Sequence, residues 1–135
     1  MEEVGFLRRA WRRARIAWRA RSAVRRVVLG PDGFELRWEA RGARRPVRVE
    51  AVAWDSVVSI LAFKVDRWTV DEIRLAFELR DGRRVEISEE CGGYPELVRE
   101  LPERLVGCAA FEDWWPKVAF PAFEANLTVV FGRPA

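Results

Sequence analysis

Apolar positions near the N-terminus recur every three or four residues, which is the spacing of one face of an α-helix. They form a stripe made of Val4, Leu7, Trp11, Ala14 and Trp18. Arginines occupy the opposite side of the same helical wheel, and they include Arg8, Arg12, Arg15 and Arg19. The pattern predicts a basic amphipathic helix over residues 1–26, which ends before the β-branched pair Val27 and Val28.

From Val27 onward the apolar period changes to two, which is typical of β-strands. The turn residues 31–33 separate the first two strands, and a corner at Trp54 and Asp55 leads from the third strand to the fourth. The inward-facing positions that the alternation predicts are Phe34, Leu36, Trp38, Val49, Ala51, Val57, Leu61, Phe63, Ile73, Leu75, Phe77 and Leu79. The pair Asp81-Gly82 predicts a tight hairpin into one more strand at residues 85–87.

A helix is expected after Gly92-Gly93, because apolar residues return to helical spacing there. Pro95 suits its first turn, whereas Pro102 is expected to interrupt or shorten it. The remaining chain is rich in aromatic residues and proline, with a final strand expected at residues 127–131. Its aromatic side chains are expected mainly to complete the core, and any that stay exposed would be interface anchors. We therefore expect one domain over residues 1–135, with the N-terminal helix at 1–26, sheet plus helix at 27–106, and an aromatic C-terminal extension at 107–135.

This order of elements resembles a bacterial pleckstrin-homology-like (PH-like) domain over about residues 27–105. The resemblance is carried by the corner "VAWDSVVSI", the hairpin "LRDGRRVEI" and the leucine-containing helix after "CGG". It implies an α+β fold, in which a curved antiparallel sheet or partly open barrel is capped by a C-terminal helix, here with an N-terminal amphipathic helix added. It also implies binding of lipids, peptides or proteins rather than catalysis. Lipid-binding members place basic residues between the first two strands, where this chain has the short, acidic turn Pro31-Asp32-Gly33.

The residue types argue against catalysis. The sequence contains no histidine, which is the commonest general base and metal ligand, and it has only two cysteines, Cys91 and Cys108. Glu89 and Glu90 next to Cys91 favour the protonated thiol over the reactive thiolate. No glycine-rich phosphate loop is present. We expect a protein that is not an enzyme and that holds neither a cofactor nor a metal.

Charge is distributed unevenly along the chain. Residues 1–26 carry nine arginines against two glutamates, whereas the rest of the chain is net acidic although the whole has a net charge of +3. A second basic cluster, Arg41, Arg44, Arg45 and Arg48, falls around a loop between two predicted strands. Such asymmetry is typical of proteins with an anionic partner, although a chain that uses arginine as its ordinary basic residue would show it too.

Three arrangements suit the N-terminal helix: it packs on its own sheet, lies on an anionic membrane, or docks into a partner or a second copy of the chain. We expect a non-enzymatic protein-interaction or adaptor module that binds a protein or itself. The partner-binding residues would be Leu7, Trp11, Trp18, Trp114 and Trp115. The alternative is a peripheral membrane-binding module that uses this helix. The anion contacts would be Arg8, Arg12, Arg15, Arg19, Arg41, Arg44 and Arg45.

Nucleic acid is disfavoured as a partner, because no recognition motif accompanies the arginines and the tryptophans share the stripe expected to face a core. The first residues are acidic and are not followed by a long apolar run, which argues against a secretion signal. We therefore expect a cytoplasmic location, membrane-peripheral under the alternative function.

Overall fold

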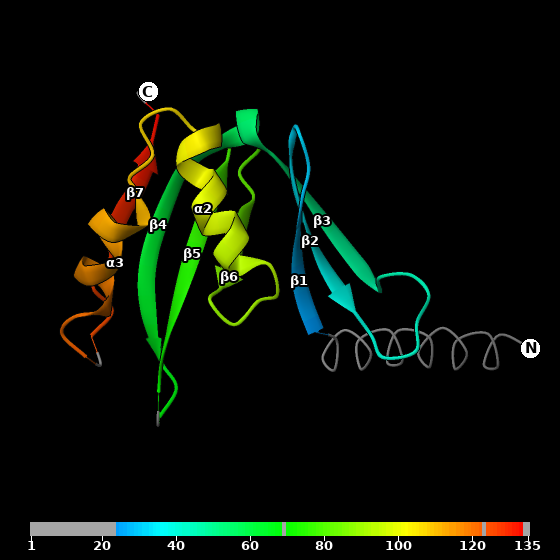
Figure 1. Ribbon diagram of the computed structural model, residues 1–135, viewed down its shortest axis with the longest axis horizontal. Helices are drawn as coiled ribbons and strands as arrows, with labels where there is room; N and C mark the ends of the chain where they lie inside the picture. The colour runs from blue at the N-terminus through cyan, green and yellow to red at the C-terminus, as the bar shows by residue number, and fades with distance from the viewer. Residues whose placement is uncertain (1–23, 69, 123, 134–135) are drawn as a thin grey trace, which may run out of the picture.

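The computed structural model describes residues 24–68, 70–122 and 124–133. This part of the chain has an α+β fold with two antiparallel sheets and two α-helices (Figure 1). The N-terminal helix expected over residues 1–26 falls largely outside the described residues. The expectation of a helix is wrong for its last three positions, because residues 24–26 belong to a β-strand. No helix in the described part is long and apolar enough to span a bilayer.

The first sheet is a meander of β1 (Val24–Leu29), β2 (Gly33–Glu39) and β3 (Arg48–Ala53). Residues 24–26 are extended because they pair with β2, and the Arg26 Nε donates to Glu39 Oε1 at 2.7 Å across that pair. Gly33 begins β2 where it meets β3, and a Cβ there would lie 2.0 Å from the Val52 carbonyl oxygen. The turn therefore needs glycine at this position.

The second sheet has the strand order β6-β5-β4-β7. Its strands are β4 (Val57–Asp66), β5 (Asp71–Leu79), β6 (Arg84–Ser88) and β7 (Thr128–Gly132). A 3₁₀ turn, η1 (Trp54–Ser56), forms the corner between the sheets. The Asp81-Gly82 hairpin is confirmed, as is the inward face of β5, where all four expected apolar residues are buried.

The inward face expected for β3 is wrong, because Val49 and Ala51 are exposed and Val52 is buried. Val52 pairs with the buried Phe34 of β2, which places Val49 and Ala51 on the opposite face.

The inward face expected for β4 is also wrong after its first residue. Val57 is buried as expected, but Leu61 and Phe63 are only half-buried, and the buried positions are Ile60, Ala62 and Lys64. A register irregularity between Val57 and Ser59 adds one residue to β4. Because side chains alternate with a period of two, this bulge moves every following residue to the other face.

Helix α2 (Tyr94–Arg104) lies over the open side between the two sheets (Figure 1). Gly93 precedes it at φ 79°, and a Cβ at this glycine would lie 2.4 Å from the Val27 carbonyl oxygen, so the close approach of α2 to β1 requires glycine. Pro102 lies inside the helix, which ends two residues later at Arg104. A second helix, α3 (Phe111–Ala119), which the sequence pattern did not predict, packs against β4 and β7.

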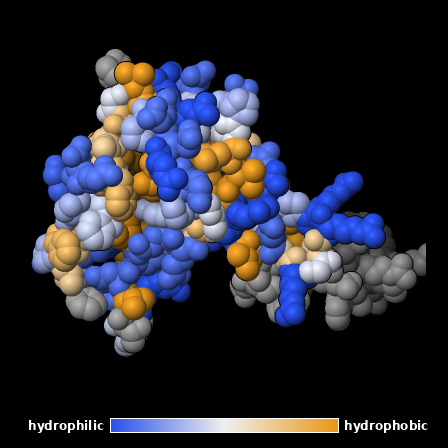
Figure 2. Space-filling view, viewed as in Figure 1, coloured by the Kyte–Doolittle hydropathy of each residue, from blue (hydrophilic) through white to orange (hydrophobic). Residues whose placement is uncertain are grey.

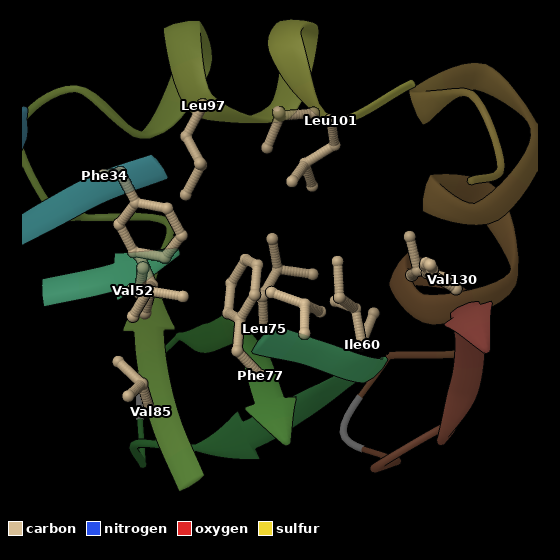
Figure 3. Close-up of a cluster of buried hydrophobic side chains, with 14 of the residues drawn as sticks. Phe34, Val52, Ile60, Leu75, Phe77, Val85, Leu97, Leu101 and Val130 are labelled. Carbon is tan, nitrogen blue, oxygen red and sulfur yellow. The ribbon is translucent and has the colours of Figure 1, made fainter. Parts of the chain in front are cut away.

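Buried apolar side chains from both sheets and α2 converge on one core (Figure 3). Leu97 and Leu101 point down from α2 towards Ile60, Leu75 and Phe77 of the four-stranded sheet. Trp54 is buried at the corner, with its ring centroid 5.4 Å from that of Phe34 in the first sheet. The corner tryptophan therefore joins the two sheets, as expected for a core residue.

Candidate functional site: the basic end of the three-stranded sheet

The loop that joins β2 to β3 carries the basic cluster seen in the sequence. Residues 40–47 line a hollow of about 600 Å³. The loop is fixed at both ends, because the Ala43 amide donates to the Ala40 carbonyl at 3.1 Å and the Val47 amide donates to the Trp38 carbonyl at 2.8 Å. Gly42 allows the turn between them at φ 78°. The sequence therefore forms a defined turn rather than a continuation of either strand.

The arginines of this loop face solvent. Arg41, Arg44 and Arg45 are all exposed. Among the described residues, the ion pairs of this sheet join Arg26 to Glu39, Arg37 to Glu35 and Arg48 to Glu50, and none of them includes a loop arginine. Three guanidinium groups thus stand within five residues without a carboxylate partner in the described part of the chain. This arrangement leaves their charge available to an external anion.

The end of the three-stranded sheet that holds Arg41, Arg44 and Arg45 is here called the basic end. The start of β1 lies at this end too. Val24 pairs with Glu39 and Arg25 pairs with Trp38, so the chain enters the fold beside the β2–β3 loop. Arg48 at the start of β3 lies over the Trp38 ring, 4.5 Å from its centroid, which is a cation–π contact. The pairing of β1 with β2 therefore places the start of β1 next to the β2–β3 loop, although these two basic segments are separate in the sequence.

Residues 1–23, which precede β1, contain seven of the arginines. The expected site residues Leu7, Arg8, Trp11, Arg12, Arg15, Trp18 and Arg19 belong to this segment and lie outside the described residues. The fold defines the point where residues 1–23 join the three-stranded sheet. This point lies at the same end of the sheet as the β2–β3 loop with Arg41, Arg44 and Arg45 (Figure 1).

A second charged cluster covers the outer face of β5 and β6 and is neutralised internally. It consists of Arg67, Arg74, Arg84, Glu72, Glu78 and Glu86. Five ion pairs join its members at nitrogen–oxygen distances between 3.0 and 3.7 Å. Three positive and three negative charges offset one another, so this face has no excess charge with which to attract an anion.

Glu72 is the buried centre of this second cluster. Its carboxylate accepts hydrogen bonds from the Ser88 hydroxyl, from Arg67 at 3.0 Å and from Arg74 at 3.2 Å. Burial alone would raise the pKa of Glu72, but these hydrogen bonds outweigh it and hold the pKa at about 2. Glu72 therefore stays ionised over the physiological range and acts as a structural anchor.

The aromatic residues of the C-terminal segment lie mostly inside the fold. Trp114, expected in a partner-binding surface, is only 2% exposed and packs edge-on against Phe111 at a centroid distance of 5.3 Å. Trp115 is half-buried and contacts Phe111 and Phe120. Trp114 therefore completes the core, as expected for most of this segment, and is not an exposed partner contact, because α3 turns its side chain inward.

The two cysteines are free thiols in the structure. Burial raises the pKa of Cys91, and burial raises the pKa of Cys108 to about 11. Both groups are therefore protonated near neutral pH, and neither has the thiolate character of a nucleophile. Among the described residues, no cluster of three cysteines or carboxylates could hold a metal ion.

Trp68 was given no role from the sequence and is the most unusual surface residue. It lies in the connection between β4 and β5 and is 96% exposed. One feature of the sequence could have identified Trp68 as a candidate site residue. It is a tryptophan in a turn between two apolar strands, where small or polar residues are usual.

Comparison of the chain with protein-family models, curated proteins and solved structures gives no match. The PH-like resemblance therefore remains an expectation from the sequence.

Proposed function

We propose that the chain is a non-enzymatic, PH-like binding module that docks onto an anionic membrane surface through the basic end of its three-stranded sheet. The observation that carries this proposal is that Arg41, Arg44 and Arg45 are exposed and have no ion-pair partner within residues 24–68, 70–122 and 124–133. Each basic residue near an anionic bilayer contributes about 1 kcal/mol of binding free energy. Arginines already held in ion pairs would contribute less, because docking would have to compete with their internal partners.

The PH-like part of the proposal is supported by two antiparallel sheets with a helix over the opening between them, after β6. Two departures change the expected mode of binding. The turn between β1 and β2 is short and contains Asp32, and the unpaired arginines are one connection later. We therefore propose attraction to the general negative charge of the bilayer rather than recognition of one lipid head group.

The sequence ranked a protein-interaction or adaptor module first and membrane binding second. Two features of the fold favour the reverse order. Residues 1–23, with seven arginines, join the fold at the basic end, so their charge adds to that of the loop. In addition, Trp114 lies in the core and does not offer an exposed anchor for a protein partner.

Vesicle co-sedimentation tests the proposal. The triple variant Arg41→Gln, Arg44→Gln, Arg45→Gln should bind vesicles of phosphatidylcholine and phosphatidylserine roughly 100-fold more weakly than the wild type, since about 3 kcal/mol of attraction is removed. A matched control is Arg99→Gln, Arg104→Gln, Lys117→Gln, which removes the same charge from exposed positions on α2 and α3. Equal affinities for the two variants would count against the proposed face.

A second candidate function, the protein-interaction or adaptor module, is supported by β7. This strand is at the edge of the four-stranded sheet, and Leu127 and Val129 are 67% and 66% exposed. The segment before α3 covers part of the edge, because the Ala109 amide donates to the Val130 carbonyl at 2.9 Å. Light scattering tests this candidate with a second copy as partner, and Leu127→Ser with Val129→Ser should then convert a dimer to a monomer.

A further inference from the structure

The hairpin between β4 and β5 ends in an exposed apolar tip. Trp68 is 96% exposed and Val70 is 54% exposed. Figure 2 shows a small hydrophobic area at the lower end of the larger lobe, apart from the larger hydrophobic areas of the body. A tryptophan with so little contact to its own chain contributes almost nothing to the core, so its position calls for an explanation outside the fold.

The backbone holds Trp68 in place. Its φ is 72°, a left-handed conformation that a bulky side chain rarely adopts. Two hydrogen bonds fix this turn: the Trp68 amide donates to Asp66 Oδ1 at 2.9 Å, and the Arg67 amide donates to the Val70 carbonyl at 3.0 Å. The side chain therefore projects from a defined turn. Strained residues of this kind are concentrated at binding sites.

The base of the hairpin is anchored and its acidic groups are engaged. Asp66 accepts the Trp68 amide, and Asp71 lies 3.3 Å from the buried ammonium group of Lys64. Lys64 also donates to the carbonyls of Ala119 and Pro121, which flank Phe120, a residue that is 65% exposed. Trp68 and Val70, here called the apolar tip, thus extend from a hairpin whose base is tied to the end of α3, next to the exposed Phe120.

The apolar tip and the basic end face the same way. The two sheets diverge from α2, so the β4–β5 hairpin and the β2–β3 loop both lie at the lower side of the molecule in Figure 1. A flat anionic surface could touch both at once. A bilayer offers this combination, with phosphates to meet the unpaired arginines and an interfacial layer below them that suits tryptophan.

We infer that Trp68 and Val70 insert into the interfacial layer of the same anionic bilayer that the basic end of the sheet contacts. This inference rests on the proposed function and adds to it a second, apolar point of contact. Arginine attraction brings the protein to the surface, and the hairpin then enters it. Binding should therefore have a salt-sensitive component from the arginines and a salt-insensitive component from the apolar tip.

The first test uses Trp68→Ser with Val70→Ser on vesicles of phosphatidylcholine and phosphatidylserine. Loss of two apolar side chains from the interface should weaken binding about tenfold or more, and the remaining binding should still fall with salt. Val106→Ser is the matched control. Val106 is 99% exposed, but it follows α2 at the upper side of Figure 1. The Val106→Ser variant should bind these vesicles with the affinity of the wild type.

The second test uses vesicles with brominated acyl chains, which quench tryptophan fluorescence at the interface. Trp68→Phe keeps an apolar ring and should keep its affinity, but the quenched part of the fluorescence should fall relative to the wild type. If quenching and affinity are the same in the wild type and all variants of Trp68 and Val70, the proposed insertion of these two residues is wrong, while the proposed function stands. If the wild type does not bind anionic vesicles at all, the proposed function fails first. The wild type could instead bind neutral and anionic vesicles equally well, with binding lost in Trp68→Ser, Val70→Ser. That result would support insertion of the apolar tip and reject docking through the basic end.

Discussion

The ammonium group of Lys64 lies 3.3 Å from Asp71 Oδ2, across the pair of strands β4 and β5, and its side chain is only 3% exposed. The same group donates hydrogen bonds to the carbonyl oxygens of Ala119 at 2.8 Å and Pro121 at 2.5 Å. One buried lysine therefore joins the base of the hairpin to the end of α3. This contact fixes the apolar tip relative to the rest of the fold.

Replacement of this lysine should destabilise the protein. In Lys64→Met the carbonyl oxygens of Ala119 and Pro121 lose the hydrogen bond from Lys64, although Pro121 keeps the one from the Asn126 side-chain amide. The buried ion pair with Asp71 is also broken, and breaking such a pair by removing one partner costs about 3–5 kcal/mol. The free energy of unfolding from urea denaturation measures the effect. Lys117→Met, at the exposed lysine of α3, is the control and should change stability by less than about 0.5 kcal/mol. A loss below about 1 kcal/mol in Lys64→Met would show that the contact does not hold the two elements together.

Glu72 should make stability depend on pH in the acid range. Its pKa is about 2 in the folded state against an ordinary value of 4.5, so the folded state binds fewer protons than the unfolded state between these values. The contribution of Glu72 is therefore complete above about pH 4.5 and is lost as the pH falls towards 2. Glu72→Gln should be less stable than the wild type at pH 7, and the difference should shrink on acidification.

Urea denaturation of both proteins at a series of pH values between 7 and about 2 measures this difference. Glu103→Gln, at an exposed glutamate of α2, is the control and should follow the wild type throughout. A constant difference between Glu72→Gln and the wild type at every pH would contradict the role assigned to the ionised carboxylate.

The corner tryptophan should be a major contributor to stability. Trp54→Ala should cost about 3–5 kcal/mol, because a large buried side chain is removed between the two sheets. Trp54 Nε1 has no hydrogen-bond partner among the described residues, so Trp54→Phe loses volume but no hydrogen bond. Chemical denaturation should therefore show less than half the cost for phenylalanine. Equal costs for both variants would point to a specific role of the indole nitrogen.

Local signals in the sequence were enough to predict much of the sheet. The alternation in β5 and the Asp81-Gly82 hairpin were correct, because both depend on residues close together in the chain. The face of β4 was not predicted, since the bulge after Val57 depends on how β4 pairs with β5 and β7 rather than on its own residues. Strand β1 extends to Val24 because β2 supplies its hydrogen bonds, which a helical wheel does not reveal.

Helix α3 was also missed, although the burial of aromatic residues of this segment was expected. Pro116 lies inside α3, and proline within a segment normally argues against a helix. The helix is instead stabilised by burial of Trp114 and Val118 against the sheet. For the candidate site, the loop arginines were identified correctly as a cluster. Only the fold shows that their loop lies next to the start of β1 and that the β4–β5 hairpin lies at the same side of the molecule (Figure 1).

Binding of the full chain to vesicles of increasing phosphatidylserine content tests the central proposal most directly. The account predicts weak binding to pure phosphatidylcholine, a steep rise in affinity with the phosphatidylserine fraction, and a marked loss between about 0.1 M and 1 M salt, where the screening length falls from about 10 Å to about 3 Å. An affinity that does not change with either phosphatidylserine content or salt would contradict docking through Arg41, Arg44 and Arg45.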